Sequence, residues 1–193
     1  MRLLLIGPPG SGKGTQATRI GNHYGIAHIS SGELLRRQVE LDTPIGRAVR
    51  DYLARGDLVS DGIVMDLLRR PVETASRQGG YVLDGFPRTV AQAEAAYLIA
   101  RELGAGVQVA LYLNVPRDQL IERMVSRGRA AGRADDSLDV INHRLDVFDD
   151  QTTPLLDYYA HREVLVTVDG TKPADDVTAT AVAELDRVRP TLR

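Results

Sequence analysis

Apolar residues in this chain gather in short uninterrupted runs, separated by longer stretches with helical spacing. The runs cover Arg2–Ile6, Tyr81–Leu83, Val107–Val115 and Val164–Val168, with a weaker candidate at Ala27–Ile29. Helical spacing occurs, for example, at Ala91–Leu103 and Arg117–Arg127. A continuous apolar run, unlike an alternating one, is typical of a strand buried on both faces. The pattern therefore predicts an α/β fold, with a parallel β-sheet flanked by helices on both faces.

Two stretches depart from this alternation of strands and helices. Residues 30–59 have the pattern of two short helices with no strand between them, and Gly128–Asp136 is rich in glycine and charge. Pro154 is expected to bend or divide the helix that follows Ser137. Interruptions of a regular scaffold are where ligand-binding pieces usually lie. We therefore expect one folding unit with a core of residues 1–29, 60–126 and 137–193, a ligand-binding or mobile insertion at 30–59, and a second such piece at 127–136, called the short lid below.

Composition narrows the possible functions. The chain has 193 residues, a formal net charge of −2 and 43% hydrophobic residues, so nothing global favours a nucleic acid or a membrane as partner. It contains no cysteine, which excludes disulfides and thiol catalysis and agrees with a reducing compartment. The apolar run at the start is too short for a signal peptide or a transmembrane helix. We expect a cytoplasmic protein. All but two of the 24 basic residues are arginine, and the two lysines are Lys13 and Lys172.

The strongest motif follows the first predicted strand. Gly7-Pro8-Pro9-Gly10-Ser11-Gly12-Lys13-Gly14-Thr15 matches the pattern G-x-x-x-x-G-K and leads into a helical segment. Glycine permits positive φ, so successive backbone N–H groups can turn inward onto phosphate oxygens. The helix adds its positive end, and the lysine reaches the β- and γ-phosphates. The motif predicts that the phosphates of a nucleoside triphosphate bind at Gly10, Ser11, Gly12, Lys13, Gly14 and Thr15.

A second group of motifs carries candidate ligands for another phosphate and a base. Ser30-x-x-Glu33 is a capping box that opens a helix, and Arg36 lies one turn further along. Asp84 ends a buried strand, where it suits a water bound to Mg²⁺, although an aspartate at this place can also be a simple helix cap. Arg88 offers a planar fork for phosphate. Gln92, four residues on, is expected on the same helix face, and its amide can pair with adenine as both donor and acceptor.

These motifs together resemble the nucleoside monophosphate kinase family, and GPPGSGKGTQ resembles adenylate kinases in particular. The resemblance runs over essentially the whole chain. It implies that Ser31 and Arg36 bind AMP and that Gly56-Asp57-Leu58-Val59 holds its adenine, although a helix-ending glycine loop explains the latter stretch equally well. UMP/CMP kinases typically have Ala and Asn where this chain has Ser31 and Gln92, so these two residues favour AMP. The implied AMP site consists of Ser31, Arg36, Asp57, Leu58, Val59, Gly85, Phe86, Pro87, Arg88, Gln92, Arg133 and Arg144.

The resemblance also assigns roles to the arginines near the predicted lid. Arg123 and Arg127 share a helix face, and in the family the matching residues stack on the ATP base and grip its phosphates. Arg133 and Arg144 match arginines that hold the transferring phosphoryl group, with Arg129 as an alternative to Arg133. The backbone at Gly170 matches a loop that lies against the ATP adenine, whereas Lys172 is expected at the surface. The implied catalytic residues are Lys13, Arg88, Arg127, Arg133 and Arg144.

The resulting hypothesis is an ATP:AMP phosphotransferase, an adenylate kinase that converts ATP and AMP reversibly into two ADP, with Mg²⁺ carried by ATP and bound through water at Asp84. The resemblance implies a monomer of the short-lid type without zinc. No general base is needed, because the AMP phosphate oxygen is already ionised and transfer depends on positioning and charge neutralisation. Two alternatives remain: a UMP/CMP kinase, and a regulatory protein that binds nucleotide without transferring phosphate.

Overall fold

The computed structural model describes the whole chain except residues 103, 105, 132–136 and 189–193. The strands are β1 (Arg2–Ile6), β2 (Ala27–Ser30), β3 (Tyr81–Asp84), β4 (Val109–Asn114) and β5 (Leu165–Asp169). The helices are α1 (Lys13–Tyr24), α2 (Ser31–Glu40), α3 (Pro44–Arg55), α4 (Asp61–Arg77), α5 (Val90–Glu102), α6 (Arg117–Ala131), α7 (Leu138–Val147), α8 (Pro154–Ala160) and α9 (Ala174–Val188). Every strand expected from the apolar runs is present.

The strands form one parallel sheet in the order β2-β3-β1-β4-β5. After β1 the chain crosses to β2 on one side, and after β3 it crosses to β4 on the other. The direction of winding therefore changes between β1 and β3, where Leu5 pairs with Asp84. In sheets of this kind, ligands bind beyond the carboxyl ends of the strands at such a switch point.

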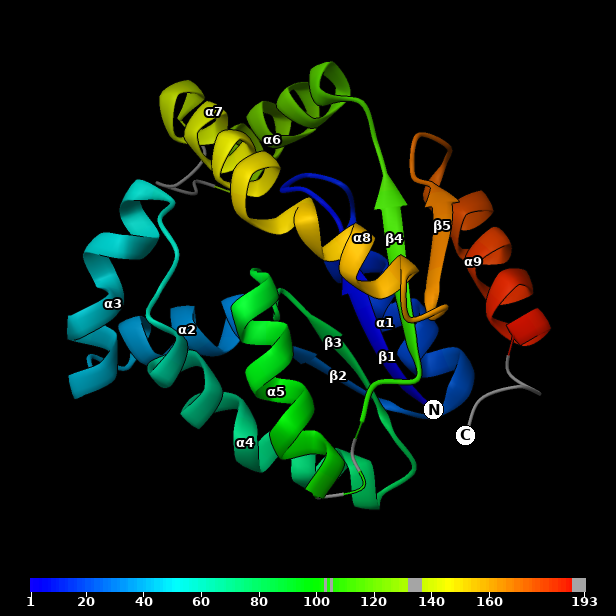
Figure 1. Cartoon of the computed structure of the whole chain (residues 1–193). Helices are drawn as coiled ribbons and strands as arrows, with labels where there is room; N and C mark the ends of the chain where they lie inside the picture. The colour runs from blue at the N-terminus through cyan, green and yellow to red at the C-terminus, as the bar shows by residue number, and fades with distance from the viewer. Residues whose placement is uncertain (103, 105, 132–136, 189–193) are drawn as a thin grey trace.

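Side chains of β1 alternate between two apolar clusters, one on each face of the sheet. Leu3 and Leu5 pack with α1 and α9, in a cluster that includes Ile20 and Leu185. Leu4 and Ile6 pack on the opposite face, in the cluster that contains buried residues of α2, α3, α4, α5 and α8. Figure 1 shows α5 and α8 in front of the sheet and α6 with α7 beyond the tip of β4. The predicted α/β fold with helices on both faces is confirmed.

Local signals account for most helix boundaries. Gly25 and Gly56 end α1 and α3 with φ values of 65° and 81°, in the left-handed region that favours glycine. Thr43 caps α3 by accepting a hydrogen bond from the Gly46 amide at 3.0 Å. Residues 30–59 hold two helices, α2 and α3, with no strand between them after β2 ends at Ser30, as predicted.

The sequence predicted the end of α6 less accurately than the break between α7 and α8. Helix α6 continues to Ala131, beyond the helical spacing recognised up to Arg127, so residues 127–131 of the predicted lid are helical. Gly128 costs a helix only about 1 kcal/mol, and the arginines and alanines around it are good helix formers. The predicted division near Pro154 is confirmed, since a π-helical turn at Phe148–Thr152 separates α7 from α8. In the part of the chain that the structure describes, none of the helices has the length and apolar character that a membrane crossing requires.

Candidate active site

The loop between β1 and α1 forms a cradle at the switch point of the sheet. Gly10 and Gly12 have φ values of 84° and 92°, and Gly12 caps α1. A Cβ at Gly12 or Gly14 would meet no described atom within 4 Å, so the backbone there faces open space. Ser11 Oγ is buried and has no hydrogen-bond partner among the described residues. With the exposed Thr15 in the first turn of α1, this loop presents N–H groups and hydroxyls to an anion.

The lysine of the loop faces the arginines of two other segments. Lys13, Arg88 and Arg144 line one cavity of about 100 Å³, together with Gly7, Gly85 and Leu58. Lys13 Nζ donates a hydrogen bond to the Pro8 carbonyl at 2.9 Å, which holds the ammonium over the loop. The segments that follow β1 and β3 meet here because these strands are parallel neighbours in the sheet, and α7 contributes Arg144.

Burial and neighbouring positive charges lower the pKa values of the basic side chains in this cavity. Burial is the main cause that lowers the pKa of Lys13 from 10.5 to about 8; Asp84 opposes it, and the charges of Arg88, Arg144 and Arg127 add to it. Burial likewise lowers the pKa of Arg88, and the charges of Arg144 and Arg36 lower it further. Lys13 therefore senses the charges of Arg88, Arg127 and Arg144, and Arg88 senses those of Arg36 and Arg144. Such a cluster is stabilised by polyanionic ligands.

Asp84 is the acidic member of this cluster. It ends β3 and is 9% exposed. It pairs in register with Leu5, just before the phosphate loop, and it lies at the end of a buried strand, as the sequence indicated. In the described residues there is no group of three or more His, Cys, Asp or Glu side chains able to hold a metal ion. A lone carboxylate beside a phosphate loop suits Mg²⁺ that arrives on a triphosphate, because Mg²⁺ retains several waters and needs few protein ligands.

A second, smaller pocket adjoins the first through Gly85, Arg88 and Leu58. Most of its lining residues belong to the AMP site implied by the resemblance: Ser31, Asp57, Leu58, Val59, Gly85, Phe86, Arg88 and Gln92. The apolar side chains of Leu35, Leu53 and Val64, which the sequence did not assign, complete the lining. Ser31 is 1% exposed, and its Oγ has no hydrogen-bond partner in the described part of the chain. A Cβ on Gly85 would lie 2.7 Å from this oxygen, and its φ is 81°, so only glycine leaves the space in front of Ser31 open.

Gln92 is held from both ends of its amide. Its Oε1 accepts from the Arg88 backbone N–H at 2.7 Å, and its Nε2 donates to Asp61 Oδ1 at 2.7 Å. An amide has two donor hydrogens and two acceptor lone pairs, so one of each remains for a base. The expectation that Arg88 and Gln92 share a helix face is wrong. Thr89 Oγ1 accepts from the Gln92 amide and α5 begins at Val90, so Arg88 lies before the helix.

The loop before α4 is fixed by a contact from α7. Asp57 accepts hydrogen bonds from Arg55 at 2.8 Å and pairs with His143 at 2.8 Å, and these two partners, Arg55 first, lower its pKa. Arg144 lies over the same loop, where a Cβ on Gly56 would be 2.5 Å from its Cγ. The side chain of Asp57 is thus engaged within the protein, although Asp57, like Leu58 and Val59, also lines the pocket.

The sequence analysis did not identify two residues that hold the site residues in place. Asp61, which orients Gln92, stands 31 positions away, and His143, which pairs with Asp57, stands 86 positions away. Neither belongs to a motif. Gln16, in contrast, belongs to the loop motif but binds α9: its amide donates to the Ala174 carbonyl at 2.9 Å and accepts from Thr178 at 2.8 Å. Its position in the motif reflects packing of α1 on α9.

Of the predicted lid arginines, Arg123 is placed most clearly. It donates to the carbonyls of Gly170 and Thr171 at 3.0 and 3.2 Å, so it joins α6 to the loop after β5 that the resemblance assigned to ATP adenine. Arg127 lies on the next turn of the same helix, toward the cation cluster. Arg133 lies outside the described residues, as does the side chain of Arg129, so the choice between them stays open. Lys172 is exposed, as predicted.

Known proteins resemble this chain over nearly its whole length. The adenylate kinase family model matches residues 5–164. An adenylate kinase of Kocuria rhizophila is 42% identical over 186 residues, which cover 96% of this chain and 99% of that protein. One from Xanthomonas oryzae pv. oryzae is 42% identical over 192 residues, covering 100% and 99%, and one from Stenotrophomonas maltophilia is 41% identical over 185 residues, covering 96% and 99%. The resemblance expected from the motifs is confirmed, and the chain belongs to the adenylate kinase family.

Proposed function

We propose that this protein is an ATP:AMP phosphotransferase, which transfers the γ-phosphoryl group of MgATP reversibly to AMP and so forms two ADP. The observation that carries the proposal is the cation cluster that spans both pockets. Lys13 lies at the phosphate loop, Arg88 lines both pockets, and the pocket beyond it contains the Ser31 hydroxyl and the Gln92 amide. A protein that only bound ATP would have no use for the second pocket.

In this proposal the two nucleotides meet end to end at Arg88. ATP lies on Gly10, Ser11, Gly12, Lys13, Gly14 and Thr15, with its base near Arg123 and Gly170. AMP lies against Ser31, Arg36, Asp57, Leu58, Val59, Gly85, Phe86, Pro87 and Gln92. Mg²⁺ belongs to the ATP substrate, and Asp84 would hold one of its waters.

The chemical step needs little covalent participation by the protein. An oxygen of the AMP phosphate forms a bond to the γ-phosphorus of ATP, and the bond from that phosphorus to the β–γ bridging oxygen breaks, so ADP leaves with the electron pair. Lys13, Arg88, Arg127, Arg133 and Arg144 neutralise the charge that both phosphate chains bring together. Residues 30–59 and the lid at 127–136 close over the reactants in this proposal and exclude water, which would otherwise accept the phosphoryl group.

The proposal predicts a strong preference for AMP among nucleoside monophosphates. Purified protein with MgATP should form ADP rapidly with AMP and far more slowly with UMP, CMP or GMP, because Gln92 and Ser31 match adenine and leave other bases poorly paired. Nucleotide products can be quantified by ion-exchange chromatography. Faster turnover of UMP or CMP would favour the pyrimidine alternative, and ADP formation from ATP alone at the same rate would exclude phosphoryl transfer to AMP.

Replacing Gln92 with alanine tests the base contact. We expect Gln92→Ala to raise KM for AMP by about tenfold or more, because a base hydrogen bond is lost and Asp61 is left without its partner. KM for ATP should change little, since Gln92 lines only the second pocket. Steady-state kinetics with each substrate varied would measure both values. Gln151→Ala, at an exposed position, serves as control; equal increases for AMP and ATP would count against base recognition by Gln92.

A further inference from the structure

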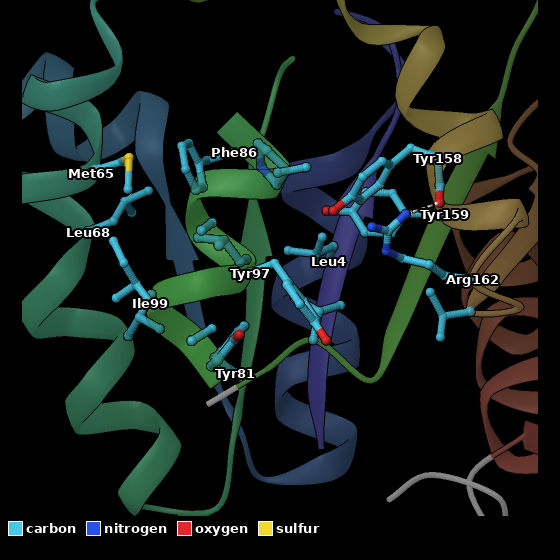
Figure 2. Close-up of a pocket in the computed structure, with 18 of the residues that line it drawn as sticks. Leu4, Met65, Leu68, Tyr81, Phe86, Tyr97, Ile99, Tyr158, Tyr159 and Arg162 are labelled. Carbon is cyan, nitrogen blue, oxygen red and sulfur yellow. Dashed lines mark hydrogen bonds between the residues drawn. The ribbon is translucent and has the colours of Figure 1, made fainter. Parts of the chain in front are cut away.

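A large apolar cavity lies on the face of the sheet that carries α4, α5 and α8, apart from the phosphate loop. Its volume is about 350 Å³, within the range of small-molecule sites. Leu4 of β1 forms its floor, Met65 and Leu68 of α4 and Tyr97 of α5 form its sides, and Tyr158 and Tyr159 of α8 close it opposite α4 (Figure 2). None of the residues assigned to ATP lines it, whereas Phe86 and Pro87 of the implied AMP site line its edge.

The polar groups of this cavity are cationic or are hydroxyls. Among the residues that the structure describes, Arg69 and Arg162 are the charged ones that line the cavity, and none of the acidic ones does. Arg162 is positioned by its neighbours: its guanidinium lies 3.5 Å from the centroid of the Tyr158 ring and 6.0 Å from that of Tyr97, and it donates to the Tyr158 carbonyl at 3.2 Å. Figure 2 shows this arginine reaching back over the tyrosine at one end of the cavity.

The hydroxyl of Tyr158 gives a second polar contact. Its oxygen atom is buried and makes no hydrogen bond of ordinary geometry in the described part of the chain, although the Arg162 side chain lies close enough to act on the pKa of this phenol. Burial also raises the pKa of this phenol, so the hydroxyl remains a donor at neutral pH. Glu94, the acidic residue whose charge reaches Tyr158, is exposed and does not line the cavity.

We propose that this cavity binds a small amphipathic anion, a medium-chain carboxylate whose alkyl chain fills the apolar space between α4, α5 and α8 and whose carboxylate pairs with Arg162. The apolar walls favour an alkyl chain by the ordinary hydrophobic effect. The positive rim without acidic lining selects an anionic head over a neutral one. The Tyr158 hydroxyl donates to the same carboxylate.

Isothermal titration calorimetry with decanoate, below its micelle concentration, tests this site on the whole protein. We expect saturable binding with one site per chain. Arg162→Gln should weaken binding about tenfold, as for loss of a charge-assisted hydrogen bond, and decanol should bind correspondingly less tightly than decanoate to the unaltered protein. Arg101→Gln removes the same charge from an exposed position of α5 outside the lining and should leave decanoate binding unchanged.

A cavity-filling variant separates this site from the nucleotide cleft. Ala96 lines the cavity from α5 and has no assigned role in the reaction, so Ala96→Leu should abolish decanoate binding while adenylate kinase turnover persists. Retained turnover shows that the variant is folded. Absence of saturable decanoate binding to the unaltered protein, or unchanged binding in Ala96→Leu or Arg162→Gln, would overturn the proposal. Displacement of decanoate by ATP would do so too, because none of the residues assigned to ATP lines the cavity.

Discussion

Lys13→Met should lower kcat by about 10²–10³-fold, the loss typical of removing one group that stabilises charge in the transition state. Methionine keeps most of the length of the side chain but carries no charge and cannot donate to the Pro8 carbonyl, to which Lys13 Nζ is bound at 2.9 Å. ADP formation from saturating MgATP and AMP, measured by a coupled assay, gives kcat directly. A kcat within a few fold of the unaltered protein would remove Lys13 from the catalytic step.

The same variant should be more stable than the parent when no nucleotide is bound. The pKa of Lys13 is about 8 in the folded protein against 10.5 in the unfolded chain, so between these pH values the unfolded chain binds more protons. The free energy of unfolding of the parent therefore rises as pH increases from about 8 to about 10.5. At pH 7 Lys13 is charged in both states, so the folded protein gains none of this stability and bears the full cost of the charge. At pH 7, Lys13→Met removes a cation that is costly to bury, and we expect the Tm to rise by about 2–4 °C, the shift for roughly 1 kcal/mol in a chain of this size.

The chain provides its own control for both measurements. Lys172 is the other lysine, and it is exposed on the loop after β5. Lys172→Met makes the identical chemical change without removing a buried charge, so kcat and Tm should stay near the parent values. If Lys13→Met were less stable than the parent at pH 7 without nucleotide, the crowding of cations around Lys13 would not be a source of instability.

Arg88→Ala has the second large expected effect. Arg88 lines both pockets, and its Nε donates to the Gly85 carbonyl at 2.8 Å, which fixes the guanidinium at the boundary between them. Its loss should lower kcat about 10²–10³-fold, because it lies where the proposed transfer occurs. Arg70→Ala, on the exposed side of α4, should retain normal kinetics.

A spectroscopic measurement distinguishes the electrostatic role of Arg88 from a structural one. The positive charge of Arg88 contributes to the low pKa of Lys13, so Arg88→Ala should raise that pKa above about 8. With only two lysines in the chain, NMR of the lysine side chains resolves Lys13 from Lys172 without ambiguity. An unchanged pKa of Lys13 in Arg88→Ala would show that the two cations do not interact as the structure indicates.

The parts of the fold that the sequence predicted are those encoded locally. The apolar run of β1, the glycines of the following loop and the start of α1 are contiguous, so one segment carries the whole phosphate cradle. The end of α6 was missed because Gly128 is only a weak helix breaker, and packing, which a local pattern does not carry, decides whether such a helix continues.

In the candidate site, the sequence predicted which residues take part better than it predicted the hydrogen bonds between them. Gln92 was identified, but its bonds to the Arg88 backbone and to Asp61 depend on how α4 packs beside α5. The pairing of Asp57 with His143 likewise depends on α7 crossing the loop before α4. The cavity beneath Tyr158 and Tyr97 was not predicted. Such a cavity depends on how three helices and a sheet pack together, and the hydrophobic pattern of any one of these elements does not reveal it.

The bond from the Arg88 backbone to Gln92 Oε1 has a consequence for how this enzyme distinguishes its substrates. The side chain proposed to recognise the base and the arginine proposed to hold the phosphate form one mechanical unit. A base that matches the free donor and acceptor of Gln92 leaves this unit in place, whereas a mismatched base that competes for Oε1 draws it away from the Arg88 amide and displaces the guanidinium from the point of transfer. Fidelity would then be exerted on the rate of reaction of a bound substrate as well as on its affinity, so a wrong monophosphate that occupied the site would still react slowly.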